Sequence, residues 1–508
     1  MDHLPLYQKD SVRVRIAPSP TGPLHIGTAR VALFNYLFAR QHQGTFVLRI
    51  EDTDPKRSSP KWERDIMENL KWLGILWDEG PTLNKDYIGP YGPYRQSERK
   101  EIYKKYIKKL FDNGFLYWCY CTKEELEAQR QEQISRGEPP RYTGHCRNLT
   151  KEQIERYKKE GRKGILRFKV PSKIITIHDI IRGKLEFDTS LFGDIAVARD
   201  FSTPLYNLAV VIDDYEMKIN YVIRGEDHLP NTPKQILLQE ALGFPRPKYA
   251  HLPLILGPDR AKLSKRHGVV SIGDYRRWGY LPEALINFMA LLGWNPGTNE
   301  EIFSIKDLIK RFSLERVQKS AAVFNSQRLD WMNGYYIRKM PIDELTEKCI
   351  PYLIEDEISK IKDQKYKIKE TGEIVDFNYL KNIISLFQER LKKLSEIREL
   401  SDFFFKKELE YEPHLLLWRN ATYLETQKNL KKCYKVLKRV GEREWEKEKI
   451  KEVLMKEAEK ESDRGKIFWP FRVALTGKKA SPPPFEIAEI LGKEKTLKRI
   501  EEAIKLVS

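Results

Sequence analysis

Residues 18–28 (PSPTGPLHIGT) combine histidine, glycine and threonine in a way that suits phosphate binding. His25 stands just ahead of a segment with helical spacing, and Gly27 and Thr28 open that segment. Backbone N–H groups at a helix start bind anions, and glycine lets a phosphate approach closely. A histidine beside a glycine can also belong to an ordinary turn, so this segment alone leaves both interpretations open.

Residues 262–266 (KLSKR) supply a second, strongly basic segment close to a glycine. Lys262 and Lys265 lie in a turn that could close over a triphosphate and stabilise the charge developing on a leaving pyrophosphate. Taken alone, the segment could equally be a solvated run of charge. A basic loop and an anion-binding helix start in one chain together predict a nucleoside triphosphate site.

Three of the five cysteines, Cys119, Cys121 and Cys146, lie close together in the sequence. Their C-x-C-x24-C spacing can supply three thiolate ligands to zinc. A cluster of free thiols is the alternative, and the spacing leaves it open. So few cysteines in 508 residues cannot staple a fold, which predicts a reducing, cytoplasmic location.

The elements that must position these residues begin with a strand, helix and strand. Val12, Val14 and Ile16 alternate with arginines, which predicts a strand, and residues 28–44 follow the spacing of an amphipathic helix. Residues 45–54 read as a strand that ends in carboxylates. This βαβ unit predicts an α/β fold with a doubly wound, parallel Rossmann-type sheet that binds ligands at the strand ends.

The sheet is predicted to be interrupted and then completed. Residues 123–137 form a polar helical stretch and residues 165–199 are rich in strand signals, which indicates an inserted α+β module. Apolar runs at 205–214 and 219–228 both end in acidic residues, and we interpret them as two further buried strands. From residue 313 onward helical spacing dominates, so an all-helical C-terminal region is expected.

Composition narrows the classes of function. Apolar residues make up 41% of the chain, and the net charge is +18 with a pI near 9.3. No apolar run approaches the roughly 20 residues of a membrane span, and the first residues lack the pattern of a signal or transit peptide. The basic surplus is spread along the chain, which suits one long acidic ligand such as a nucleic acid.

Five segments in order give the chain a family resemblance. They are RIAPSPTGPLHIGTAR, LRIEDTD, VIRGEDH, KLSKRHG and FRVALTGKKASPPPFEI. Together they resemble the bacterial-type glutamyl-tRNA synthetases, a branch of the class I aminoacyl-tRNA synthetases. Glutaminyl enzymes and eukaryotic glutamyl enzymes usually carry a second histidine where this chain has Thr28, and they have C-terminal β-barrels, so both features favour the bacterial branch.

The resemblance implies a glutamate–tRNA ligase that joins glutamate to AMP at the expense of ATP and then transfers it to the 3′ end of tRNA-Glu. Family positions imply that His25, Lys262 and Lys265 act on the ATP phosphates, and that Gly27 and Thr28 line the nucleotide site. Mg²⁺ is expected with ATP. A monomer is expected from the resemblance alone.

The resemblance also implies an amino-acid pocket. An arginine fork is the best reader of a carboxylate and disfavours the neutral amide of glutamine. Arg15 and Tyr206 would hold the side-chain carboxylate of glutamate, Arg224 the α-carboxylate and Glu51 the α-ammonium, with Ser19 assisting. Charges at strand ends are often only solvated, but their convergence on one sheet edge favours a pocket.

For the cysteine cluster, zinc-binding relatives place a histidine two residues after the last cysteine, where this chain has Asn148. Two substitutes remain open, His145 beside Cys146 and Tyr142 four residues before it. A related family that modifies a tRNA base uses a tyrosine at that offset. Zinc and a relic site with free thiols therefore remain alternatives.

We expect a division of labour along the chain. The four predicted domains are a split Rossmann catalytic domain (1–98 and 208–248), an inserted acceptor-end-binding module (99–207), a stem-contact domain with the KLSKR loop (249–341) and a helical anticodon-binding domain (342–508). Three alternatives stay open: a non-discriminating synthetase that also charges tRNA-Gln, a small-molecule nucleotidyltransferase, and an RNA-binding module without catalysis.

Overall fold

The predicted βαβ unit is present in the computed structural model, which describes residues 11–508 except 55, 85, 264–270, 355–359 and 362–364. Strand β1 (Arg13–Ile16) pairs in parallel with β2 (Thr45–Leu48), and helix α1 (Ile26–Gln41) connects them. The chain leaves α1 through Gly44, where a Cβ atom would lie 2.2 Å from the carbonyl oxygen of Val12. The helix ends at Gln41, three residues before the stop predicted at Gly44, and only glycine allows the close approach to Val12 with which the chain enters β2.

A second parallel pair completes the catalytic sheet region. Strand β10 (Tyr221–Gly225) pairs with β11 (Lys248–Leu252), with α7 (Thr232–Leu242) between them. Strand β1 lies beside β10, because Asn220 N–H donates to the carbonyl of Arg13. This arrangement confirms the Rossmann-type parallel topology and brings the carboxyl ends of β1 and β10 to one edge.

The sequence analysis predicted a buried strand at 205–214, and this prediction is wrong. The apolar run is part of helix α6 (Tyr206–Glu216). Every residue from Leu208 to Asp214 is buried, because α6 is covered by neighbouring elements on most of its circumference. A helix with so little exposed surface loses its 3.6-residue pattern and reads like a buried strand.

The inserted module contains a three-stranded sheet, a hairpin and, after α3 (Lys100–Asp112), the helices α4 (Lys123–Ser135) and α5 (Lys151–Lys159). Strands β5 (Leu116–Cys119), β6 (Ile165–Phe168) and β9 (Ile195–Ala198) form an antiparallel sheet, and β7 (Ile174–Asp179) and β8 (Gly183–Asp188) form a hairpin. Helices α4 and α5 each begin with a capping box. This confirms the α+β character expected for the insertion.

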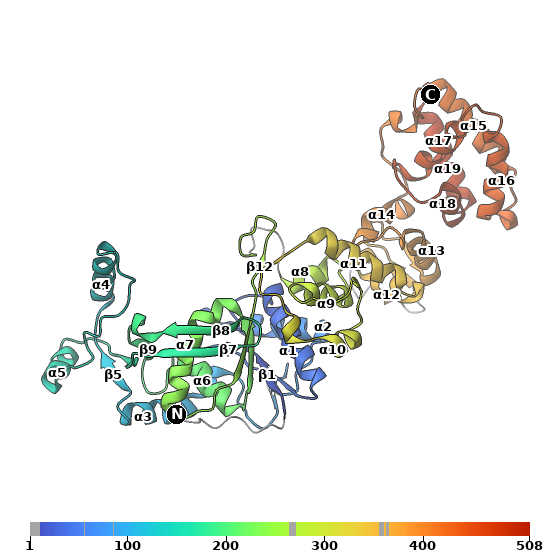
Figure 1. Cartoon of the computed structure of the whole chain (residues 1–508). Helices are drawn as coiled ribbons and strands as arrows, with labels where there is room; N and C mark the ends of the chain where they lie inside the picture. The colour runs from blue at the N-terminus through green and yellow to red at the C-terminus, as the bar shows by residue number, and fades with distance from the viewer. Residues whose placement is uncertain (1–10, 55, 85, 264–270, 355–359, 362–364) are drawn as a thin grey trace. The chain divides into compact units, whose positions relative to one another are not determined.

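The chain has other described elements before residue 340, several of which are labelled in Figure 1. They are α2 (Pro60–Trp72), β3 (Gly80–Pro81), β4 (Tyr87–Ile88), β12 (Ile255–Leu256), α8 (Ile272–Arg277), α9 (Pro282–Leu291), α10 (Ile305–Arg311), β13 (Ala322–Val323) and α11 (Ser326–Lys339).

The C-terminal region is helical, as predicted, with one small addition. Its helices are α12 (Ile342–Leu353), α13 (Phe377–Phe387), α14 (Glu396–Phe405), α15 (Tyr423–Lys438), α16 (Lys447–Ala458), α17 (Gly465–Thr476), α18 (Pro484–Leu491) and α19 (Lys493–Leu506). Short strands β14 (Lys360–Ile361), β15 (Lys365–Lys367) and β16 (Ile374–Asp376) form an antiparallel sheet that the expectation of an all-helical region did not include. Strands this short carry too little alternation to be predicted.

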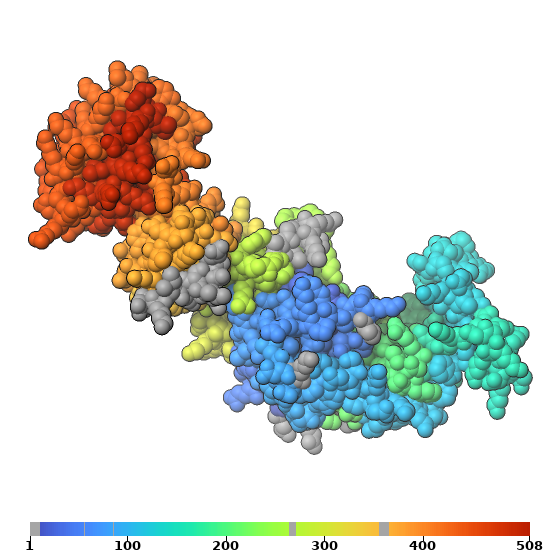
Figure 2. Space-filling view, turned by 180° about the vertical axis from the view of Figure 1, so that it is seen from behind, coloured from blue at the N-terminus to red at the C-terminus, as the bar shows by residue number. Residues whose placement is uncertain are grey.

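The chain divides into two units, whose residues can be followed by colour along the sequence in Figure 2. The first contains residues 1–276 and 282–329, and the second contains 277–281 and 330–508. The short segment 277–281 is fixed inside the second unit, since the Gly279 carbonyl accepts from Leu394 N–H at 3.0 Å and the Trp278 carbonyl accepts from the Ser395 hydroxyl at 2.7 Å. No helix in the described ranges is long and apolar enough to cross a membrane.

Candidate functional site

A cavity of about 710 Å³ lies at the carboxyl ends of β1 and β10 in the first unit. Its lining includes nine residues that the sequence analysis had singled out: Arg15, Ser19, His25, Gly27, Thr28, Glu51, Tyr206, Arg224 and Lys262. Lys265 lies outside the described residues. Two sequence-distant motifs and a set of strand-end charges therefore share one cavity, as expected for a doubly wound sheet.

His25 is the N-cap of α1, and this role fixes its protonation pattern. Its Nδ1 accepts the backbone N–H of Gly27 at 3.0 Å, so the neutral ring carries its proton on Nε2. Burial, aided by the positive charge of Lys262, lowers the pKa of His25. The first turn of α1 contains no acidic residue. The helix start thus offers an imidazole donor and an uncompensated partial positive charge to an anion.

Lys262 reaches the mouth of the cavity and pairs with Asp227, with 3.1 Å between Nζ and Oδ2. The Lys262 side chain is 64% exposed and the Asp227 side chain 48%. Although partial burial opposes ionisation, the hydrogen bond from Lys262 lowers the pKa of Asp227. An exposed pair of this kind is weak, so an incoming triphosphate can take the lysine from Asp227 at little cost.

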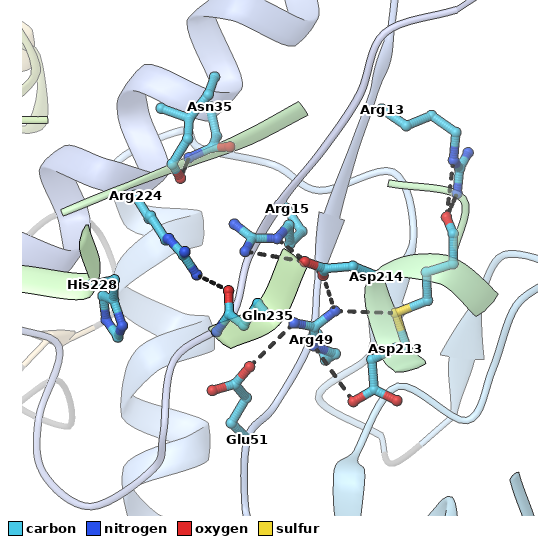
Figure 3. A network of polar contacts seen from close by, with 12 residues as sticks. Arg13, Arg15, Asn35, Arg49, Glu51, Asp213, Asp214, Arg224, His228 and Gln235 are labelled. Atoms are coloured by element: carbon cyan, nitrogen blue, oxygen red, sulfur yellow. Dashed lines mark hydrogen bonds and ion pairs between the residues drawn. The ribbon is translucent and has the colours of Figure 1, made fainter. Parts of the chain in front are cut away.

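Behind the cavity lies a buried network of arginines and carboxylates (Figure 3). Arg15 donates to both carboxylate oxygens of Asp214, at 3.1 and 3.3 Å, and Arg49 donates to the same carboxylate at 2.6 Å. Arg49 also donates to Glu51 at 3.2 Å. Arg15 and Glu51 line the cavity, whereas Asp214 and Arg49 do not. The two lining side chains are therefore oriented by residues behind them.

The charges of this arginine–carboxylate network balance. It consists of Arg15, Arg49, Arg99, Glu51, Asp213 and Asp214, with Arg99 donating to Asp213 at 2.7 Å. Against the opposing effect of burial, Arg15 and Arg49 lower the pKa of Asp214, whereas burial raises the pKa of Glu51 in spite of Arg49. With all members ionised, the network is neutral and needs no ligand to compensate it.

Arg224 is different because its hydrogen-bond partners are all neutral. Its guanidinium donates to Gln235 Oε1 at 2.8 Å, Thr232 Oγ1 at 2.8 Å and His251 Nε2 at 3.2 Å. It is almost completely buried, and within the described ranges no carboxylate lies at ion-pair distance from it. Burial lowers the pKa of Arg224. A buried cation without a counter-ion is costly, so this one is suited to receive a carboxylate from a ligand.

Tyr206 enters the cavity from the first turn of α6, and its hydroxyl lies 2.9 Å from Nδ1 of His228. Burial, with Glu51 nearby, raises the pKa of Tyr206 to about 12. Burial beside Arg224 lowers the pKa of His228 to about 4. Both groups are therefore neutral near pH 7 and can donate or accept hydrogen bonds without adding charge to the pocket.

The cysteine cluster forms a separate site in the inserted module. The sulfur atoms of Cys119, Cys121 and Cys146 all lie within 4.8 Å of one another, and the hydroxyl of Tyr142 lies 3.4 Å from Cys119 Sγ and 3.8 Å from Cys121 Sγ. Edges near 3.8 Å are those of a tetrahedron with bonds of about 2.3 Å, the usual zinc–sulfur distance. His145 is exposed, and no histidine or carboxylate of the described residues joins the cluster.

Tyr142 is held firmly in this cluster. Its hydroxyl accepts the backbone N–H of Cys146 at 2.8 Å, and the guanidinium of Arg167 lies 3.8 Å over its ring. At Gly193 a Cβ atom would lie 2.5 Å from the backbone nitrogen of Tyr142, so only glycine fits there. Of the two substitutes that the sequence left open, the structure brings only Tyr142 to the thiols.

The sequence analysis missed Asp227 in the lining and the residues behind the cavity. Asp227, Arg49 and Asp214 lie at the ends of apolar segments that it had marked as ending in charge, but their partners could not be inferred. Gln235 and His251 carry no local signal, because only the folded chain brings them to Arg224.

Comparison with known families gives two matches that together span most of the chain. Residues 11–331 match "tRNA synthetases class I (E and Q), catalytic domain", and residues 344–504 match "Anticodon binding domain".

Individual proteins are similar over nearly the full length. A glutamate–tRNA ligase of Caldicellulosiruptor saccharolyticus is 50% identical, with 96% of this chain and 98% of the relative covered. One from Carboxydothermus hydrogenoformans is 47% identical, with 96% and 99% covered. The crystal structure of a glutamate tRNA ligase from Elizabethkingia meningosepticum, in complex with its amino acid, superimposes with a TM-score of 0.84 at 36% identity, covering 98% of this chain and 100% of that one.

Proposed function

The chain belongs to the class I tRNA synthetases for glutamate and glutamine, and from that membership we infer that it is a glutamate–tRNA ligase. In this reaction glutamate and ATP give glutamyl-adenylate and pyrophosphate. The 3′-terminal ribose of tRNA then takes the glutamyl group and releases AMP. The enzyme is therefore ATP-dependent and has glutamate, ATP and tRNA as its ligands.

One observation carries the choice of amino acid: the cavity lining includes the buried arginines Arg15 and Arg224, and Arg224 has only neutral hydrogen-bond partners. Glutamate has two carboxylates, so it can present one to each of these arginines. Glutamine has only its α-carboxylate, and its neutral side-chain amide would face a guanidinium, which favours a carboxylate as its partner. The pocket thus favours glutamate over its amide electrostatically as well as by hydrogen bonding.

We propose roles for the lining residues on this basis. Arg15 and Tyr206 bind the side-chain carboxylate, and Arg224 binds the α-carboxylate. Glu51, which Arg49 holds in place, receives the α-ammonium, and Ser19 assists. No covalent enzyme intermediate is required, so positioning and charge stabilisation supply the catalysis.

On the nucleotide side, His25 donates from Nε2 to the phosphates, with Gly27 and Thr28 lining the site. Lys262 leaves Asp227 to contact the triphosphate, and Lys265 is proposed to join it from the segment outside the described residues. Mg²⁺ arrives with ATP and bridges its phosphates.

The remaining domains are proposed to bind tRNA: the insertion (99–207) at the acceptor end, residues 249–341 along the stem and residues 342–508 at the anticodon. We further propose that the enzyme works as a monomer in the cytoplasm. Light scattering of the purified protein checks the oligomeric state, and a mass of twice 60.0 kDa would contradict it.

Glutamate-dependent ATP–pyrophosphate exchange tests the proposed function. We expect exchange with glutamate in the presence of tRNA-Glu, and far less with glutamine. Charging assays with purified tRNA-Glu and tRNA-Gln complete the test. Substantial glutamylation of tRNA-Gln would contradict the strict pairing with tRNA-Glu, and an absence of exchange with every tRNA would contradict the function itself.

We propose that the cysteine cluster and Tyr142 bind zinc as three thiolates and one phenol oxygen. The close spacing of the three sulfur atoms and the Tyr142 hydroxyl, and the guanidinium that holds the Tyr142 ring in place, support this ligand set. The role of the ion would be structural, because a site closed by four protein ligands leaves no position for a substrate.

Metal analysis of the purified protein tests the zinc site. We expect one zinc ion per chain, lost in Cys146→Ser and retained in Cys349→Ser, whose thiol is buried in the other unit. Tyr142→Phe should lose zinc to a chelator about 10-fold faster than the unaltered protein, in the range that a weakened ligand shell causes. The proposal would be overturned if protein purified from zinc-supplemented cells contained no zinc and the thiols of the cysteine cluster reacted freely with a thiol reagent.

A further inference from the structure

The turn of the β7–β8 hairpin reaches from the inserted module to the last strand of the catalytic sheet. Ile180 N–H donates to the carbonyl of Tyr249 at 2.9 Å, and Arg182 Nε donates to the carbonyl of His251 at 3.3 Å. At the end of β7, Asp179 lies 2.7 Å from Nδ1 of His251 through its Oδ2. Both of these side chains are fully buried.

The contact fixes the tautomer of His251. A carboxylate only accepts, so Nδ1 of the imidazole must carry a proton and donate it to Asp179. Burial lowers the pKa of His251 in spite of Asp179, and against the effect of burial the His251 hydrogen bond lowers the pKa of Asp179. The ring is therefore neutral, and its Nε2 is left as an acceptor.

That acceptor faces Arg224. Nε of Arg224 lies 3.2 Å from His251 Nε2, and Thr232 Oγ1 lies 3.0 Å from the same nitrogen while it accepts from Nη2 of Arg224. With Gln235 on Nη1, each nitrogen of the guanidinium has one fixed neutral partner. His251, Thr232 and Gln235 together fix the plane of the Arg224 guanidinium. Of these three, His251 also contacts a residue of the inserted module, Asp179.

We propose that Asp179 and His251 are positioning residues for the binding of the α-carboxylate of glutamate: Asp179 holds His251 in the tautomer that accepts from Arg224, and His251 holds the guanidinium in its binding orientation. The inference rests on the proposed role of Arg224. It makes a hairpin of the insertion part of the support of the amino-acid pocket.

The test is the effect of His251→Phe on the KM for glutamate, measured by ATP–pyrophosphate exchange with tRNA-Glu present. We expect this KM to rise about 10- to 100-fold, as for other residues that orient a ligand-binding group, with little change in kcat or in the KM for ATP. His251→Gln keeps an acceptor near the position of Nε2, so it should recover much of the loss. His178→Phe, on the exposed face of the same hairpin, is the matched control and should not alter the KM for glutamate.

A double-mutant cycle separates positioning from general damage. In an Arg224→Gln background, His251→Phe should raise the KM for glutamate little further, because the guanidinium that His251 orients is gone. If the two substitutions acted independently on the structure, their effects on this KM would multiply. If Arg224→Gln itself leaves the KM for glutamate unchanged, the proposed role of Arg224 fails. The positioning inference alone is overturned if Arg224→Gln raises the KM for glutamate but His251→Phe does not. It is also overturned if the double variant raises this KM by the product of the two single effects.

Asp179→Asn provides a second route should His251→Phe fold poorly. An amide can present its own N–H to Nδ1, which moves the ring proton to Nε2 and sets it against the Arg224 donor. We expect a rise in the KM for glutamate in the same direction, and an unchanged KM would count against the inference.

Discussion

Replacing His25 with asparagine should slow glutamate-dependent ATP–pyrophosphate exchange by about 10²- to 10³-fold, the usual effect of removing one donor to a developing negative charge. In the structure, His25 Nδ1 is occupied by the backbone N–H of Gly27, so only Nε2 is free to donate to the phosphates. Asparagine is an excellent N-cap but is too short to place a donor where Nε2 lies. Thermal unfolding and the KM for glutamate should therefore change little while the rate falls.

His25→Ala is the comparison that separates the two roles of the residue. It removes the cap as well as the donor, so it should show the same loss of rate together with a loss of about 1 kcal/mol in the free energy of unfolding. If His25→Asn exchanges pyrophosphate at nearly the normal rate, His25 serves only as a helix cap and the proposed contact with the phosphates is wrong.

Replacing Arg15 with glutamine should raise the KM for glutamate by about 100-fold or more, because truncating one partner of a buried charge pair costs several kcal/mol. The variant removes a donor from the pocket and makes the arginine–carboxylate network negative by one unit. The positive charge available to balance glutamate is therefore smaller by one unit. We therefore expect the preference for glutamate over glutamine to fall, as measured by the ratio of kcat/KM for the two amino acids.

Arg13→Gln is a matched control on the same strand. Arg13 forms a buried bidentate ion pair with Glu79, at 2.9 and 2.8 Å, and does not line the cavity. Its loss should lower the stability of the protein without changing the KM for glutamate. Equal effects of the two variants on this KM would mean that Arg15 acts through the fold and not through the substrate.

Local patterns in the sequence were sufficient to predict the parallel sheet, but the lining of the cavity also needed the family resemblance. The βαβ unit follows from alternation in β1 and a helical stretch in α1. Charges at strand ends indicated the edge where the cavity lies, since parallel strands bring their carboxyl ends to one edge, whereas individual lining residues such as Tyr206 and Arg224 came from matching family positions. Helix α6 was mistaken for a strand because burial on most sides erased its periodicity.

The support of the pocket could not be predicted in the same way. Asp214 lies on a helix 199 residues beyond Arg15 and 165 residues beyond Arg49, and Asp179 reaches His251 from another module. These partnerships depend on tertiary placement, which leaves no local periodicity or spacing in the sequence. Tyr142 was one of two candidates that spacing allowed, and only the folded chain distinguished them.

The assignment of residues 277–281 to the second unit limits how this enzyme can be taken apart. The chain passes from one unit to the other after residues 276, 281 and 329, so no single cut separates them. A C-terminal fragment starting at residue 330 would lack the carbonyls that Leu394 and Ser395 use. A C-terminal fragment meant to fold alone must therefore carry this five-residue segment, or the Leu394 N–H and the Ser395 hydroxyl lose these acceptors.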